Sequence, residues 1–250
     1  MNPFAKSPIH GRPGRGIIGR AALPLVLAGL IGLAACSGGE TKEEDIVVEG
    51  SVEDLYNRAA DLMEKHTPEL IALCAQEGGK TLKDGIAEIR EAVDFCRYYA
   101  VRGVEDFGGT TFLPGPTGES NEIYLQGRGV FACVAPWNFP LAIFMGQVAA
   151  ALMAGNAVIA KPAGQTTLIA HRAVQFLLEA GVPAEVLHFV PCSGAALGQL
   201  LGSDKRIAGV AFTGSTSTAW TINRALASRD SVIAPLIAET GGQNAMIVDS

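Results

Sequence analysis

Apolar residues recur at helical spacing between Val52 and Ala100 and predict three consecutive helices. Pro68 suits the first turn of the second helix, for which Thr67 is the predicted N-cap, and the glycine pair at 78–79 ends it. The three sets of apolar positions are Leu55, Ala59, Leu62 and Met63; Leu70, Ile71, Leu73 and Cys74; and Ile86, Ile89, Ala92, Val93 and Cys96. The cysteines of these sets are expected to be small buried residues.

After Gly127 the pattern changes to short apolar runs that alternate with helical patterns. The predicted strands are Val130–Val134, Ala157–Lys161, Val186–Val190, Val210–Thr213 and Pro235–Ala238, and the predicted helices are Leu141–Met153, Thr167–Glu179, Ala195–Leu201 and Thr216–Leu226. Before them, the glycine- and proline-rich stretch 108–128 predicts a loop and then an exposed strand, Glu122–Gln126. The predicted fold class is α/β: a Rossmann-like parallel sheet with helices on both faces, preceded by a helical N-terminal segment.

The first fifty residues have a different pattern from the rest of the chain. An apolar run of about fifteen residues, Ala21–Ala35, is too short to cross a bilayer as a helix and is typical of a signal peptide. Its end, Leu33-Ala34-Ala35-Cys36, resembles a bacterial lipoprotein signal, in which the cysteine is acylated; the alternative is a fused or unstructured leader. Residues 40–54 hold seven acids and one lysine, as in a solvated linker. We therefore predict a leader and acidic linker over 1–50 and a folded domain over 51–250.

Charge and composition narrow the function classes. The 250 residues are 48% hydrophobic and 18% charged, which excludes a disordered chain. The first twenty residues hold four of the 19 basic residues and none of the 25 acids, so residues 21–250 carry a net charge of −10. Such an acidic body argues against nucleic-acid binding. The five cysteines form no CxxC pair and the four histidines show no metal-ligand spacing, so we predict reduced thiols and no metal site.

Polar residues follow two of the predicted strands, at the sheet edge where ligands bind in such folds. Asn138 comes after the first strand, and its amide can donate a hydrogen bond to an oxyanion; the alternative is a cap for a helix that starts at Pro140. Lys161 ends the second strand and can reach ribose hydroxyls or phosphate; the alternative is a solvated strand end.

Two further candidates follow the fourth and fifth strands. In Thr213-Gly214-Ser215-Thr216, the glycine lets the backbone approach a ligand and the helix N-terminus favours an anion, although a simple N-cap explains the turn equally well. Glu239, in an apolar strand and followed by Thr240-Gly241-Gly242, can act as a general base on water; the alternative is a carboxylate in an ion pair.

Together these segments resemble the aldehyde dehydrogenase superfamily, over about Ser51 to Ser250. The segments are Pro136-Trp137-Asn138-Phe139-Pro140, Lys161-Pro162-Ala163, Phe212-Thr213-Gly214-Ser215-Thr216 and Glu239-Thr240-Gly241-Gly242. Three other stretches resemble, more narrowly, the glutamate-semialdehyde (pyrroline-5-carboxylate) dehydrogenase module of bifunctional proline-utilization proteins. They are Arg90–Tyr99, Gly115–Asn121 and Gly241–Asp249.

The resemblance implies NAD-dependent oxidation of L-glutamate γ-semialdehyde to glutamate through a cysteine thiohemiacetal, in the cytoplasm. It also implies a homo-oligomer for a full-length member of the family. The roles implied by position are oxyanion donor for Asn138, base for the hydrolytic water for Glu239, ribose contact for Lys161, pyrophosphate approach for Gly214 and Ser215, and lining of the cofactor cleft for Pro136 and Trp137.

The sequence departs from the family pattern in three ways. Gly164 stands where a ribose-binding glutamate often follows, and Cys192 replaces a loop glycine. The family's nucleophilic cysteine lies downstream of Glu-Thr-Gly-Gly, and none of the five cysteines here has its Gly-Gln-x-Cys context. We therefore expect an incomplete aldehyde dehydrogenase fold, a fragment that is inactive alone. The alternative function is a membrane lipoprotein, anchored through Cys36, with a non-catalytic dehydrogenase-like binding module.

Overall fold

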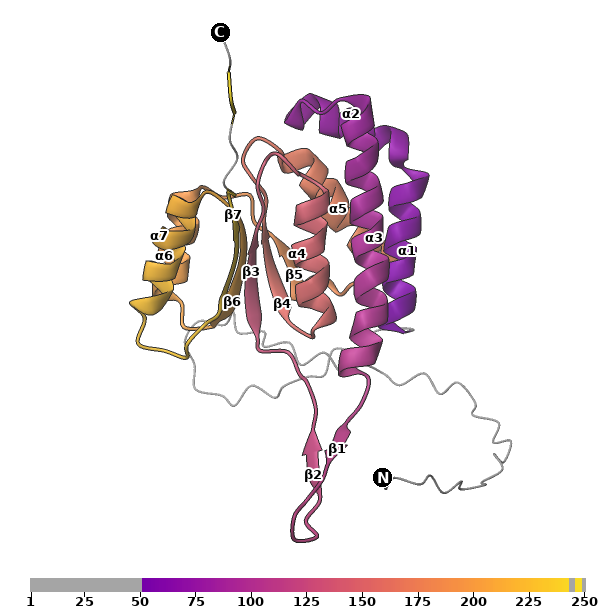
Figure 1. The fold of residues 1–250 in the computed structure, drawn as a ribbon. Helices are drawn as coiled ribbons and strands as arrows, with labels where there is room; N and C mark the ends of the chain where they lie inside the picture. Colours follow the sequence, from indigo (N-terminus) through magenta and orange to yellow (C-terminus); the bar gives the residue numbers. More distant parts are fainter. Residues whose placement is uncertain (1–50, 243–245, 249–250) are drawn as a thin grey trace, which may run out of the picture.

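The computed structural model describes residues 51–242 and 246–248, which begin with a layer of three helices (Figure 1). These helices are α1 (Val52–Lys65), α2 (Thr67–Gly78) and α3 (Leu82–Phe107). The hydroxyl of Ser51 caps α1, and Gly79, at φ +63°, ends α2 as predicted. The predicted N-cap of α2 is wrong: Thr67 is its first helical residue, and its hydroxyl donates to the Glu64 carbonyl.

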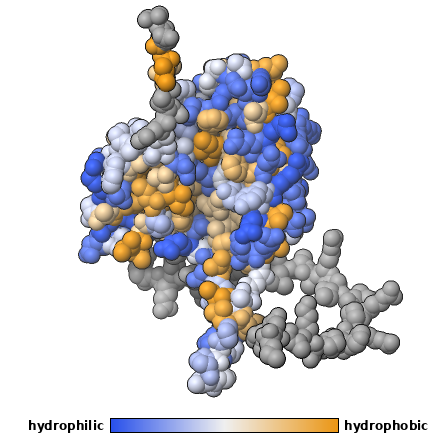
Figure 2. All heavy atoms as spheres, viewed as in Figure 1, coloured by the Kyte–Doolittle hydropathy of each residue, from blue (hydrophilic) through white to orange (hydrophobic). Residues whose placement is uncertain are grey.

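A two-stranded antiparallel hairpin follows α3 and projects from the opposite end of the molecule from α2 (Figure 1). Its strands are β1 (Thr111–Leu113) and β2 (Asn121–Ile123), whereas the sequence predicted one strand only, at Glu122–Gln126. Each strand has three residues, which is too short for an alternating pattern to identify. Figure 2 shows hydrophobic side chains at the surface of this hairpin, where Phe112 and Ile123 are exposed.

The predicted parallel sheet is confirmed, with the strand order β5-β4-β3-β6-β7. The strands are β3 (Val130–Val134), β4 (Ala157–Lys161), β5 (Leu187–Phe189), β6 (Ile207–Gly214) and β7 (Leu236–Thr240). The predicted bounds of β3 and β4 are confirmed; β5 is shorter than predicted because a 3₁₀ turn, Ala184–Val186, precedes it. From β3 the chain continues to β4 and β5 on one side of β3, and then returns to β6 and β7 on its other side. The direction of the connections therefore reverses between β3 and β6. Sheets of this kind bind ligands at such a point, beyond the carboxyl ends of the strands.

The helices cover both faces of the sheet, as predicted. They are α4 (Ala142–Met153), α5 (Thr167–Ala180), α6 (Gly194–Ser203) and α7 (Thr216–Ala227). Successive residues of a strand point to opposite faces, so Phe131 and Cys133 of β3 join a core with α1–α5, while Ala132 and Val134 join one with α6 and α7. Figure 1 shows these two groups of helices on either side of the sheet.

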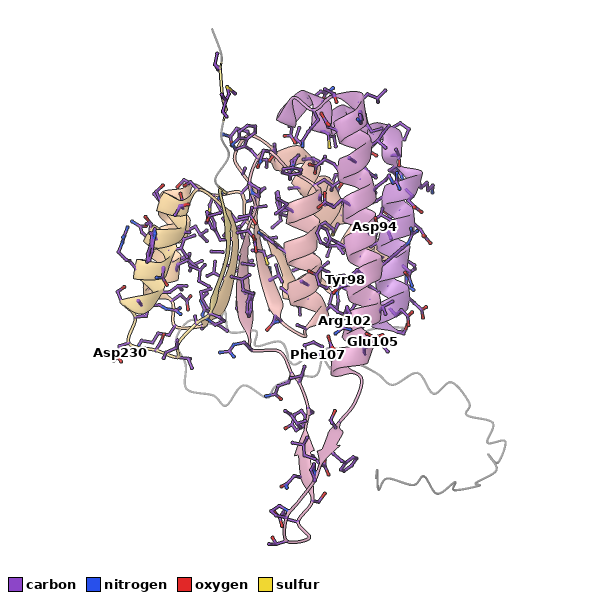
Figure 3. The ribbon with its side chains drawn as sticks, in the orientation of Figure 1. Asp94, Tyr98, Arg102, Glu105, Phe107 and Asp230 are labelled. Atoms are coloured by element: carbon purple, nitrogen blue, oxygen red, sulfur yellow. The ribbon has the colours of Figure 1, made fainter. Side chains whose placement is uncertain are left out.

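The outer face of α3 faces solvent. Asp94, Tyr98 and Arg102 follow one another at four-residue spacing, and the Arg102 guanidinium donates to Glu105 (Figure 3). Within residues 51–242, no helix has the length and hydropathy needed to cross a membrane. The predicted leader, with Cys36, lies outside the described residues.

Candidate functional site

A cavity of about 1320 Å³ opens at the carboxyl ends of the parallel strands. It is larger than the ~300–1,000 Å³ of pockets that hold drug-sized ligands, which suits a molecule the size of a dinucleotide. The structure brings all the candidate residues to the lining of this one cavity: Pro136, Trp137, Asn138, Lys161, Gly214, Ser215 and Glu239. These residues come from four strand ends, so the sheet topology places them together.

Lys161 ends β4 and is 8% exposed, so the alternative of a solvated strand end is wrong. Its Nζ donates to the carbonyl of Pro162 at 2.8 Å. Burial lowers the pKa of Lys161, and the neighbouring Cys192 thiol acts in the opposite direction. A buried ammonium with one short hydrogen bond retains donor capacity for a ligand in the cavity.

The loop between β3 and α4 presents Trp137 and Asn138 at the cavity. Trp137 is 55% exposed and Asn138 is also exposed, so an indole face and an amide are available to a ligand. The alternative of Asn138 as a helix cap is wrong, because the N-cap of α4 is Leu141 and no side chain at this cap position donates to or accepts from the helix. The carboxylate of Glu88 accepts from the first amides of α4 instead.

Carboxylates from the N-terminal helical layer occupy the N-termini of α4 and α5. Glu88 on α3 accepts from Leu141 N at 3.2 Å and Ala142 N at 2.9 Å. Glu77 on α2 accepts from Leu168 N at 2.9 Å and Ile169 N at 2.8 Å. Each acid satisfies two free amides and compensates the positive end of a helix dipole. These two helix ends are therefore already neutralised by the protein.

The N-termini of α6 and α7 are capped differently, by their own serines. Ser193 Oγ accepts from Ala196 N, and Ser215 Oγ accepts from Thr218 N, each at 3.2 Å. Gly194 and Ser215 line the cavity, so both helix ends face it with a neutral cap and uncompensated amides. The alternative of Ser215 as an N-cap is confirmed, and it is compatible with anion binding at the same turn.

Gly214 and Glu239 lie near the carboxyl ends of the neighbouring strands β6 and β7. A Cβ added to Gly214 would lie 2.7 Å from the Phe212 ring, so this position has little room for a side chain. Glu239 is the penultimate residue of β7 and pairs in register with Thr213. The expected apolar enclosure of Glu239 is not present among the described residues, because β7 is an edge strand and Glu239 is exposed.

The described cysteines are all free thiols, and three of them are buried. Burial raises the pKa of Cys74, Cys96 and Cys133 to about 12 in each case. Cys192, in the loop after β5, is half-buried. No cluster of three His, Cys, Asp or Glu side chains that could hold a metal occurs in the part of the chain that the structure describes.

Sequence reasoning missed several residues that support the site. Gln147 on α4 donates to Thr213 Oγ1 at 3.0 Å and so links α4 to the end of β6. Glu77 and Glu88 each contact amides more than fifty residues away in sequence. No local spacing indicates such contacts, because the partners come from different helices.

Comparisons with known proteins agree with this geometry. The model of the aldehyde dehydrogenase family matches residues 52–250. The chain is 51% identical over 199 residues to the bifunctional protein PutA of Klebsiella aerogenes, covering 78% of this chain and 14% of that protein. A crystal structure of a proline utilization A variant from Bradyrhizobium japonicum is 56% identical, with a TM-score of 0.74 over 76% of this chain and 20% of that one. A 1-pyrroline-5-carboxylate dehydrogenase from Thermus with bound NAD is 34% identical, with a TM-score of 0.72 over 77% of this chain and 38% of that one. The chain therefore spans well under half the length of these relatives.

Proposed function

The chain belongs to the aldehyde dehydrogenase family, and we propose that residues 51–250 are the NAD-binding part of an L-glutamate γ-semialdehyde dehydrogenase. The observation that carries this proposal is the single cavity that gathers seven candidate residues at the divergence of β3 and β6. The relatives with 51% and 56% identity are proline-utilization proteins, which supports the choice of aldehyde.

The cavity fits a dinucleotide in both size and charge. The helices α6 and α7 are capped by serine hydroxyls and carry no acid in their first turns, so their N-termini attract the pyrophosphate, which Gly214 and Ser215 let approach the backbone. Lys161 donates to the adenosine ribose. A second contact from a glutamate is missing, because position 164 is glycine in this chain. Pro136 and Trp137 line the cleft.

In this proposal, NAD would supply the hydride acceptor when bound, and the chain's own residues assist at the reacting carbon. The exposed amide of Asn138 donates to the oxyanion, and Glu239 takes a proton from the hydrolytic water. The reaction also needs a thiolate, and the buried thiols of Cys74, Cys96 and Cys133 have pKa values of about 12. The other described thiol, half-buried Cys192, is not among the residues that line the cavity. We therefore propose that this chain alone does not oxidise the aldehyde, and that another segment of the family fold supplies the nucleophile.

Calorimetric titration of the purified chain with NAD tests the proposal. We expect saturable binding, and we expect Lys161→Ala to weaken it by about 1–3 kcal/mol, the scale of a hydrogen bond to a charged group. Lys205→Ala is the matched control, because Lys205 is exposed and does not line the cavity. Absence of binding at millimolar NAD would contradict the proposal, and equal affinities of the two variants would contradict the role of Lys161.

We propose a cytoplasmic location, because NAD and free thiols occur together in that compartment. The lipoprotein-like end of the leader at Cys36 supports the alternative of a lipid-anchored binding module. Metabolic labelling with palmitate separates the two. Label that is lost in Cys36→Ala favours the anchor, and a chain without label favours the cytoplasmic enzyme.

A further inference from the structure

The loop that carries Trp137 and Asn138 is held from behind by the N-terminal helices. Glu88, 2% exposed on α3, accepts from the amides of Leu141 and Ala142, where this loop enters α4. A buried carboxylate is costly unless it is paired and hydrogen-bonded, so its position is well determined. The C-terminal anchor of the loop is therefore a contact with a different helix and not a local cap.

Lys80 completes this anchor and reaches the middle of the loop. Its Nζ lies 3.0 Å from Glu88 Oε1 and 4.2 Å from the centroid of the Phe139 ring. One ammonium thus neutralises the buried acid and makes a cation–π contact with the residue next to Asn138. The Lys80 side chain is 15% exposed, which leaves its charge only partly screened by solvent.

The end of α2 packs against the same loop. A Cβ added to Gly78 would lie 3.5 Å from Pro140 Cγ and 3.8 Å from the Trp137 carbonyl oxygen, so the helix approaches the loop closely. Figure 1 shows α2 at the end of the molecule where the loops leave the sheet. The side chains of Trp137, Asn138 and Phe139 line the cavity. Glu88 binds backbone amides at the end of the loop, Lys80 contacts the Phe139 ring, and α2 approaches the loop at Gly78.

We propose that Glu88, paired with Lys80, is a positioning residue that fixes Trp137 and Asn138 at the cavity. The expected change in NAD affinity rests on the proposed function, whereas the expected change in loop motion does not. Without the buried charge, the loop samples other arrangements and the binding-competent fraction falls. If that fraction drops to about one fifth, the Kd for NAD rises about fivefold.

The test uses the full chain in a Trp220→Phe background, in which Trp137 is the remaining tryptophan. Time-resolved fluorescence anisotropy then reports local motion of Trp137, and calorimetry reports the Kd for NAD. Glu88→Gln keeps the side-chain shape and an acceptor oxygen but removes the charge. The controls are Ile89→Val, which perturbs packing at the next residue of α3, and Glu64→Gln, which removes an exposed ion pair with Arg97.

We expect Glu88→Gln to increase the amplitude of Trp137 motion and raise the Kd, and both controls to change neither. Increased motion together with no NAD binding by any variant would support the positioning role and contradict the proposed function. Unchanged motion in a folded Glu88→Gln chain would overturn the inference, even if its Tm falls.

Lys80 provides a second pair of variants in case Glu88→Gln does not fold. Lys80→Met removes the cation and is expected to increase Trp137 motion, whereas Lys80→Arg keeps the cation and is expected to restore the wild-type amplitude. A purely structural role for Lys80 predicts that both variants lower the Tm without changing the motion of Trp137. That outcome would also overturn the inference.

Discussion

The two faces of the parallel sheet are each covered by helices, and the helices of the two faces are capped in different ways. On one face, α4 and α5 have no side-chain cap of their own and take the carboxylates of Glu88 and Glu77 from the N-terminal layer. On the other face, α6 and α7 are capped by Ser193 and Ser215, which belong to their own loops. We call these two sides of the domain, each with its own core, the α4–α5 half and the α6–α7 half. One half is therefore stabilised by tertiary contacts and the other by local sequence.

This difference decides which helix N-termini are available to bind a phosphate. The first amides of α4 and α5 already donate to carboxylates, so these helix ends are poor phosphate sites, whereas those of α6 and α7 remain available. The α4–α5 half also contains the larger core and three buried thiols. The α6–α7 half includes contacts with the edge strand β7, where Ile237 is 57% exposed. The α4–α5 half thus positions side chains, and the locally capped half presents helix ends to a ligand.

The largest expected effect concerns thiol protection in the two halves. Cys74, Cys96 and Cys133 react only when their surroundings open, so we expect native alkylation at least roughly a thousandfold slower than in the unfolded chain. Half-buried Cys192, on the other side of the comparison, should react in the native state. Mass spectrometry of peptides after timed iodoacetamide treatment measures each site. Equal alkylation rates at Cys74 and Cys192 would show that the core of the α4–α5 half does not protect its thiols.

The second effect concerns the two kinds of cap. Glu88→Ala leaves Lys80 without its partner and two amides without an acceptor, so we expect a loss of about 3 kcal/mol in the free energy of unfolding. Ser215→Ala removes a local N-cap and should cost about 1 kcal/mol. Urea unfolding measures both. A loss in Glu88→Ala no larger than that in Ser215→Ala would remove the distinction between the halves.

A smaller effect concerns the pH dependence of stability at Lys161. Because burial lowers its pKa from the ordinary 10.5, the protonated side chain destabilises the fold at every pH below the folded pKa. This cost disappears as the pH rises from the folded pKa to the ordinary value. We therefore expect Lys161→Met to stabilise the chain at neutral pH, with a gain that shrinks in alkaline solution. Urea unfolding at several pH values checks the sign, and a gain that grows with pH would contradict it.

Local patterns were sufficient to predict the parallel sheet and to place the candidate residues at one edge of it. The apolar runs of β3 and β4 are bounded by glycine, asparagine and proline, so their ends are visible in the sequence. The topology rule then places Asn138, Lys161 and Ser215 at one edge, and the cavity contains all three. These predictions succeeded because they depend on neighbours in sequence and on a general property of parallel sheets.

The remaining features depend on distant contacts and were not predictable from spacing. Glu88 is separated by 53 residues from the amide of Leu141, and its side chain resembles any other acid on an amphipathic helix. The burial of Lys161 follows from the packing around the cavity, whereas a charged strand end is ordinarily solvated. The exposure of Glu239 follows from the place of β7 at the sheet edge, which the apolar pattern of the strand does not show.

The most direct test is hydrogen–deuterium exchange of the chain with and without NAD, followed by peptide mapping. We predict slower exchange of amides at the N-termini of α6 and α7, within 194–198 and 215–219, on addition of NAD. Amides 141–142 and 168–169, already bonded to Glu88 and Glu77, should exchange at the same rate in both samples. Protection confined to the N-termini of α4 and α5 would contradict the assignment of the pyrophosphate to the N-termini of α6 and α7.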